Sequence, residues 1–214
     1  MATWGAGMKK YQQDALEGWG KFLNPKVLRS NLIAASLFLA AYETLRSSIT
    51  TQLRGLFANG FDQDGEIVDS GYQKKVLSRH KSPLRASLLW FKEMQAIGEN
   101  EIELVDRVRR HRNEPAHDLP RFLATNEKDI NVELIGGILE VVAKVDRWWI
   151  REVEIPTNPD FDEALVDDLD DSKIISGSML FLQLIIQVAT GEDDESETMY
   201  RDFMERAAER LVGT

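Results

Sequence analysis

The sequence predicts an all-α fold, because several patterns favour helices and none favours a convincing pair of strands. Apolar residues recur at three- and four-residue spacing, which places them on one face of a helix. Proline and glycine stand where the predicted helices begin and end. The chain has 214 residues, of which 43% are apolar, so one domain can bury a sizeable core.

One long helix is predicted to dominate the N-terminal part. It follows an amphipathic segment over 11–23 that Asn24-Pro25 interrupts, and it spans residues 26–57. Its inward face is predicted from apolar residues at helical spacing: Leu28, Leu32, Ala35, Leu39, Tyr42, Leu45 and Ile49. Asn59-Gly60 ends the helix, and the aspartates and glycine within 61–72 predict a loop.

Two helices are predicted in the middle of the chain. Ser82-Pro83 combines a helix cap with proline at the first helical position, so a helix should run over 83–97. Another should begin near residue 100 and reach residue 112. Its predicted inward residues are Ile102, Val105 and Val108.

Three further helices are predicted over 130–153, 172–190 and 198–211. The pair Gly136-Gly137 in the first of them favours close approach by another helix. We therefore expect a helical domain over 1–153. Residues 154–214 are expected to form an acidic connector and C-terminal helices that pack on the same domain.

Charge is unevenly distributed along the chain, although the total is −10. Residues 70–121 hold 11 basic and 7 acidic side chains, whereas residues 122–214 hold 8 basic and 22 acidic ones. A protein that coats nucleic acid is basic overall, so this pattern favours a local anion site instead. The absence of cysteine excludes disulfides and thiolate metal sites.

The sequence predicts a cytoplasmic protein without a membrane segment. The N-terminus has no apolar stretch typical of a secretory signal. The two most apolar stretches, Leu32–Tyr42 and Met179–Ala189, are short of the roughly 20 residues that cross a bilayer. Both are expected to be buried core helices.

The segment over 108–118 carries the chemistry, because it holds His111 and His117, two of the three histidines, among several arginines. Arginine binds phosphate through a planar fork, and histidine exchanges protons near neutral pH. Together they are the minimum equipment for cleaving RNA without a metal. Arg112 and His117 are about 140° apart on an ideal helix. Either a bend or break at Pro115 or a second chain is therefore needed to bring them together.

The run Arg112-Asn113-Glu114-Pro115-Ala116-His117 resembles the Arg-x4–6-His motif of the HEPN superfamily. This resemblance implies a HEPN-like helical bundle, here with additional C-terminal helices, and a homodimer in which the motifs of two chains meet. It also implies a metal-independent endoribonuclease of phage defence, abortive infection, or a toxin–antitoxin or stress system, with no cofactor. Many toxin members carry a tyrosine two residues after the histidine, where this chain has Leu119.

The resemblance also implies roles for single residues. His117 is expected to transfer the proton, Arg112 to bind and stabilise the scissile phosphate, and Asn113 to orient the histidine or the phosphate. The alternative is a catalytically inactive HEPN-like module that binds a nucleotide or a protein. The expected partners are RNA, a second copy of the chain, and an antitoxin or regulatory protein.

Other charged and aromatic residues are candidates for supporting roles. The candidate RNA-binding residues are Arg109, Arg110 and His111. Glu43 either orients the site or forms a surface ion pair with Arg46. A basic stretch either extends the RNA path or is a solvated loop: Lys74, Lys75, Arg79, His80, Lys81 and Arg85. Trp148 and Trp149 either stack on bases or serve as one core residue and one interface anchor.

Overall fold

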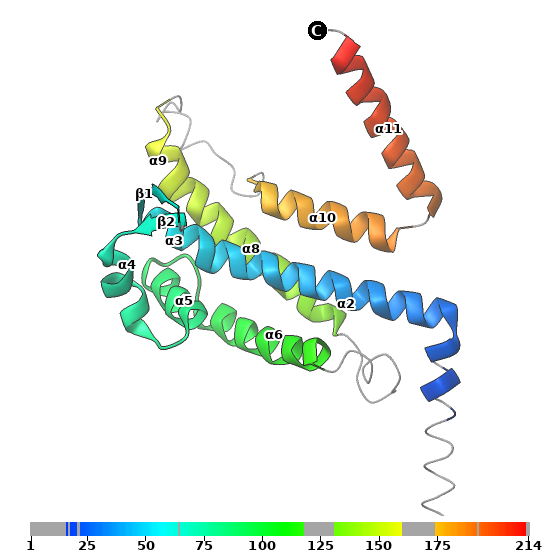
Figure 1. The fold of residues 1–214 in the computed structure, drawn as a ribbon, viewed down its shortest axis with the longest axis horizontal. Coiled ribbons are helices and arrows are strands. Elements are labelled where there is room, and N and C mark those ends of the chain that lie inside the picture. The colour runs from blue at the N-terminus through cyan, green and yellow to red at the C-terminus, as the bar shows by residue number, and fades with distance from the viewer. Residues whose placement is uncertain are drawn as a thin grey trace, which may run out of the picture.

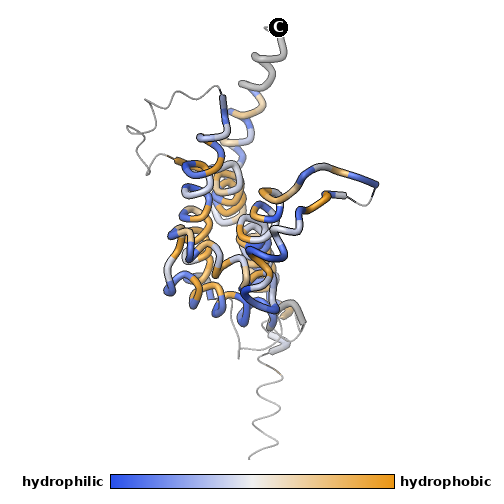
Figure 2. Tube along the Cα trace, turned by 90° about the vertical axis from the view of Figure 1, so that its left-hand side faces the viewer, coloured by the Kyte–Doolittle hydropathy of each residue, from blue (hydrophilic) through white to orange (hydrophobic). Residues whose placement is uncertain are grey.

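The computed structural model describes residues 16, 18–20, 22–63, 65–117, 131–159, 174–191 and 193–212. Within them the chain is mostly helical, which confirms the predicted all-α character. Three long helices form the body of the bundle, and α2 runs along its whole length (Figure 1). Hydrophobic and hydrophilic residues alternate along these helices, as expected where one face of each helix is buried (Figure 2).

The long N-terminal helix is present, but a π-helical turn interrupts its α-helical geometry near the C-terminal end. Helix α2 spans Pro25–Arg46, and the Asn24 side chain caps it by accepting from the backbone amides two and three residues later. A π-helical turn, Ser47–Thr51, and a short helix α3, Gln52–Leu56, continue it. The Thr50 hydroxyl donates to the carbonyl of the fourth residue before it, at 2.7 Å. Such bonds compete with the helical ladder and favour a local widening of this kind.

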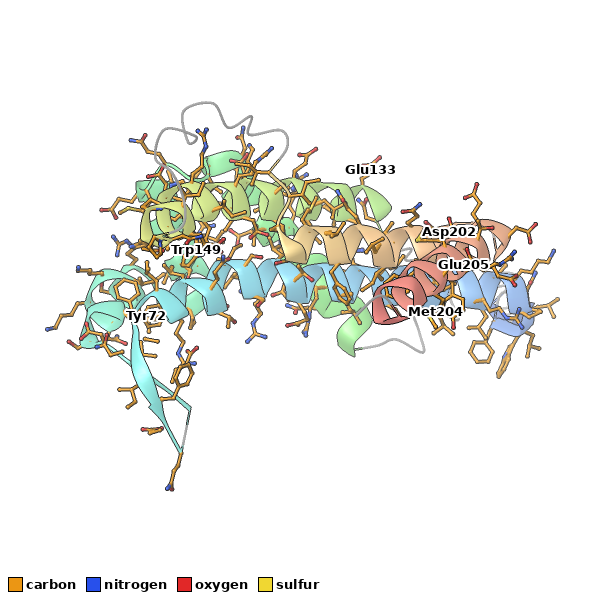
Figure 3. All side chains as sticks on the ribbon, turned by 90° about the horizontal axis from the view of Figure 1, so that it is seen from above. Tyr72, Glu133, Trp149, Asp202, Met204 and Glu205 are labelled. Atoms are coloured by element: carbon orange, nitrogen blue, oxygen red, sulfur yellow. The ribbon has the colours of Figure 1, made fainter. Side chains whose placement is uncertain are left out.

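A β-hairpin follows where the sequence predicted only a loop. Strands β1, Ala58–Asp62, and β2, Gly65–Val68, pair antiparallel, with Asp62 opposite Gly65 at the turn. Gly65 has φ 115°, a conformation that favours glycine, so the Asp-Gly sequence there was a hairpin signal. The prediction of no strand pair was therefore wrong. The hairpin projects from the end of the bundle near Tyr72 (Figure 3).

The next two helices begin as predicted, but the first ends early. After helix α4, Ser70–Lys75, and the 3₁₀ turn Leu77–Arg79, helix α5 spans Pro83–Glu93. Gln95 has φ 62°, and the amide after it bonds back to the carbonyl five residues earlier, at 2.9 Å. This left-handed cap is usually formed by glycine, which is why the sequence placed the end at Gly98.

Helices α6 and α8 complete the body of the bundle. Helix α6 spans Glu99–His117, and α8 spans Val132–Trp149. A π-helical turn, Ile150–Glu154, and the short helix α9, Ile155–Thr157, continue α8. Asp129, a residue type that often caps helices, precedes α8 in the sequence but lies outside the described residues. A Cβ atom added at Gly137 would lie 2.8 Å from Leu104 of α6, so the predicted close helix approach is confirmed there.

One hydrophobic core joins these helices. The three predicted inward residues of α6 are at most 1% exposed, whereas Leu32 on the predicted inward face of α2 is 39% exposed. The largest fully buried side chains are Phe38, Phe91, Leu45, Ile49, Leu53, Leu88, Ile102, Ile138 and Leu182. By length and composition alone, the continuous stretch Pro25–Leu56 would suffice to cross a membrane, a test that core helices also pass. Here it packs against α8 and α10.

The C-terminal helices differ in how they meet this core. Helix α10, Gly177–Thr190, packs on α2 and α8 and buries Leu182, but Phe181 is 63% exposed. The expectation of a fully buried core helix there was therefore correct for one face only. Helix α11, Asp193–Val212, begins earlier than predicted and extends away from the bundle (Figure 1).

A buried carboxyl group fixes α10 to α8. The Ser176 hydroxyl accepts from the Met179 amide, which caps α10, and donates to Oδ2 of Asp146. Asp146 is 3% exposed. Burial raises the pKa of this carboxyl, and the hydroxyls of Ser176 and Ser48 offset the rise only in part.

Replacing Asp146 with asparagine is expected to stabilise the protein relative to wild type increasingly as the pH rises above about 4. A raised folded-state pKa means that the folded wild type keeps its proton after the unfolded chain, with an aspartate pKa of about 3.9, has lost it. The wild type loses stability through that window, whereas asparagine does not titrate and still accepts from Ser176.

Thermal melting at several pH values, with exposed Asp202→Asn as the control for net charge, measures this difference. A Tm difference between Asp146→Asn and wild type that stays constant with pH would contradict the assignment.

Candidate functional site

The predicted motif lies on the last two turns of α6. The helix is anchored by Ile102, Val105 and Val108, which are buried against the rest of the bundle. It continues to His117, so the helix does not break at Pro115. The side chains over 114–117, including that of His117, lie outside the described residues.

Arg112 lies on the side of α6 that faces α2. Its guanidinium is 5.4 Å from the centre of the Tyr42 ring, and its Nη2 is 3.5 Å from Oε1 of Glu43. The Arg112 side chain is 32% exposed, so a ligand can still reach part of it. Its Nε is buried without a hydrogen-bond partner among the described residues.

Glu43 contacts two arginines rather than one. Its Oε2 accepts from Arg46 at 3.1 Å, while Oε1 lies beside Arg112. The sequence left open whether Glu43 orients the site or forms a surface ion pair with Arg46. The structure contains the ion pair with Arg46 and also a contact with Arg112. One carboxylate between two guanidinium groups leaves an excess positive charge, which favours an anion at this position.

His111 occupies a packed position next to the motif. Its Nε2 accepts a hydrogen bond from the Asn131 amide at 3.1 Å, and its ring meets Phe38 edge to face with centroids 5.0 Å apart. The side chain thereby ties α6 to α2 and to the start of α8. Its Nε2 is thus already engaged, although the sequence made His111 a candidate for binding substrate.

The side chains next to Arg112 point in different directions around α6. Arg109 lies about 60° from Arg112, whereas Arg110 and Asn113 lie about 160° and 100° away from it. Arg109, Arg110 and Asn113 are all exposed. At about 100° per residue, the helix places backbone position 117 within about 80° of Arg109 and about 40° of Asn113, but about 140° from Arg112. The helix therefore groups position 117 with Asn113 and does not bring it to Arg112.

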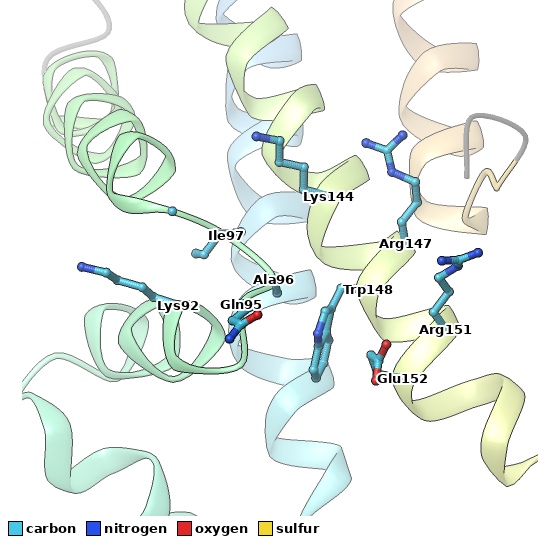
Figure 4. A pocket seen from close by; sticks show the side chains of 10 residues that line it. Lys92, Gln95, Ala96, Ile97, Lys144, Arg147, Trp148, Arg151 and Glu152 are labelled. Carbon is cyan, nitrogen blue, oxygen red and sulfur yellow. The ribbon is translucent and has the colours of Figure 1, made fainter. Parts of the chain in front are cut away.

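A cavity of about 880 Å³ lies at the N-terminal end of α6 (Figure 4). Along the helix axis, this end is about 20 Å from Arg112. The wall of this cavity includes Trp148, which packs edge to face on Trp90 and Phe91. Four basic side chains line it: Lys92, Lys144, Arg147 and Arg151. The two lysines are ion-paired with Glu99 and Glu101, and these contacts lower the pKa of both glutamates.

The two adjacent tryptophans occupy different environments. Trp149 is 7% exposed and belongs to the core, as predicted for one of the two. Trp148 is half-buried in the cavity wall. The sequence did not predict the role of Tyr42 beneath Arg112, although its neighbour Glu43 was a candidate.

No group of three or more potential metal ligands occurs among the described residues. Comparison of the chain with protein-family models, with curated proteins and with solved structures finds no match.

Proposed function

We propose that this chain is a metal-independent endoribonuclease of the HEPN type, acting in the cytoplasm in phage defence or in a toxin–antitoxin or stress system. The observation that carries the proposal is the position of Arg112. It lies at the end of a long helix, is held by Glu43 and Tyr42 of α2, and is followed by Asn113 and by His117 on the same helix. An antitoxin or regulatory protein would control such an activity.

The proposed reaction needs only groups that this chain carries. The 2′-hydroxyl oxygen of the RNA forms a bond to phosphorus, and the bond from phosphorus to the 5′-oxygen breaks. His117 takes the proton of the 2′-hydroxyl or returns one to the leaving 5′-oxygen. Arg112 donates to the phosphate oxygens, where negative charge grows. The products are a 2′,3′-cyclic phosphate and a 5′-hydroxyl, and no water is consumed in this step.

We further propose that two copies of the chain form the site. About 140° separates position 117 from Arg112 on one continuous helix, so the arginine of one chain and the histidine of the other are the natural pair. Exposed apolar side chains on the C-terminal helices supply surface for association: Leu180, Phe181, Leu184, Val188, Tyr200, Phe203 and Met204.

RNA cleavage by the purified protein in the presence of EDTA tests this proposal. Full activity is expected with the chelator, because the mechanism uses imidazole and guanidinium groups and no metal-bound water. Activity that EDTA abolishes and a divalent ion restores would remove the proposed mechanism.

The second candidate function is a catalytically inactive HEPN-like module that binds a nucleotide or a protein. It is favoured by the same 140° separation, and by the contacts of Arg112 with Glu43 and Tyr42, which already engage its guanidinium. Binding of RNA without any cleavage, with or without EDTA, would make this the better account.

A further inference from the structure

A smaller cavity of about 290 Å³ brings together two basic parts of the chain that are far apart in the sequence. His80 and Arg85 come from the basic stretch before and within α5, whereas Asp106 and Arg109 come from α6. Neither the motif nor the proposed reaction accounts for this meeting of an imidazole with a guanidinium.

The imidazole of His80 is oriented by the backbone. Its Nδ1 accepts a hydrogen bond from the Ser82 amide at 3.0 Å. A neutral ring that accepts at Nδ1 carries its proton on Nε2, so the remaining nitrogen is a donor. The Ser82 hydroxyl also lines the cavity and makes no capping bond to α5. Both groups are therefore suited to an anionic acceptor.

Of the two arginines that line the cavity, one is ion-paired within the described ranges and the other is not. Arg85 is ion-paired with Asp106 and lies 4.0 Å from Glu99, which is also ion-paired with Lys92. The two cations and two anions of this network therefore balance one another. Arg109 is exposed and forms no ion pair within the described ranges. A free guanidinium beside an imidazole donor and a hydroxyl is a set of groups that binds phosphate.

Arg109, which lines the cavity, lies on the same helix as the motif, about two turns before its end. From Arg109, Asn113 is about 40° around the helix and about 6 Å along it, and position 117 is about 80° around and about 12 Å along. A polymer with regularly spaced phosphates can therefore contact the cavity and the end of the motif at once.

We propose that the cavity of His80, Ser82 and Arg109 binds a backbone phosphate of RNA next to the scissile one. The identity of the polymer rests on the proposed function, but the phosphate site itself does not. The groups are positioned for binding only, since Arg109 and His80 touch a phosphate that does not react.

Nuclear magnetic resonance of the full chain tests the site directly, because only three histidines have to be assigned. The probes are inorganic phosphate and a short single-stranded oligodeoxynucleotide, which lacks the 2′-hydroxyl and cannot be cut by this chemistry. Both are expected to shift the His80 ring signals saturably at constant pH. Arg109→Ala should weaken oligodeoxynucleotide binding about tenfold, as expected for a lost charge-assisted bond.

The matched control is Arg107→Ala, because Arg107 is also exposed on α6 but lies about 160° around the helix from Arg109. Equal weakening by both arginine variants would overturn the site and indicate only general charge attraction. Unshifted His80 signals with both probes would also overturn it. A His80 shift in a protein that never cuts RNA would support the phosphate site and reject the proposed ribonuclease.

In a protein that does cut RNA, Arg109→Ala is expected to raise KM about tenfold with kcat nearly unchanged. A KM equal to that of the wild type would overturn the assignment of this cavity to the RNA strand.

Discussion

Replacement of His117 with alanine is expected to lower the rate of RNA cleavage by about 10²–10⁴-fold, the usual contribution of general acid–base catalysis. The reason is chemical, because alanine can neither take the proton of the 2′-hydroxyl nor return one to the leaving oxygen. The backbone of position 117 is the last turn of α6, far from the core residues that anchor the helix. The variant is therefore expected to fold.

Circular dichroism and thermal melting establish that fold, and Arg107→Ala on the same helix is the control that should cut at the wild-type rate. A folded His117 variant that cuts RNA as fast as wild type would show that the catalytic assignment is wrong. A variant that does not fold would instead indicate a structural role for this histidine.

Replacement of Arg112 with lysine is expected to reduce kcat by about 10²–10³-fold, the usual effect of removing one donor that stabilises charge in the transition state. Lysine keeps the positive charge beside Glu43 and Tyr42 but loses the planar fork that binds two phosphate oxygens. The loss should therefore appear in kcat more than in the folded stability of the protein.

Arg46→Lys is the matched control, because Arg46 contacts the same carboxylate of Glu43 from the other side. Near-wild-type activity is expected for this variant. If both lysine variants lose activity equally, the ion pairs of Glu43 matter and the proposed contact of Arg112 with phosphate does not.

The helices could be predicted from local sequence because their signals are local. Asn24-Pro25 and Ser82-Pro83 mark two helix starts, and the spacing of Ile102, Val105 and Val108 marks a buried face. Helix ends were predicted less well. Gln95 adopts a left-handed conformation that the sequence would assign to a glycine.

The hairpin and the exposed face of α10 were missed for different reasons. An Asp-Gly turn between strands of four and five residues gives a short signal that resembles a loop. A strongly apolar helix predicts burial on all sides, but the extent of burial depends on which elements reach it. Leu182 meets the core, whereas Phe181 faces away from it.

The chemistry-bearing segment could be identified from residue types, but its geometry could not. The sequence placed Arg112 and His117 together as a motif, and helical rotation alone separates their positions. The bundle brings together residues that are tens of positions apart in the sequence. Glu43 contacts Arg112, and His80 and Arg109 line the same cavity. No local pattern encodes such contacts.

The ends of the RNA fragments, determined by mass spectrometry after cleavage in EDTA, test the central claim most directly. The account predicts a 2′,3′-cyclic phosphate, or the 3′-phosphate formed from it, on one fragment and a 5′-hydroxyl on the other, because the 2′-hydroxyl is the nucleophile. Fragments with 3′-hydroxyl and 5′-phosphate ends would contradict it, since they require attack by water. The absence of fragments from a folded wild-type protein would contradict it equally.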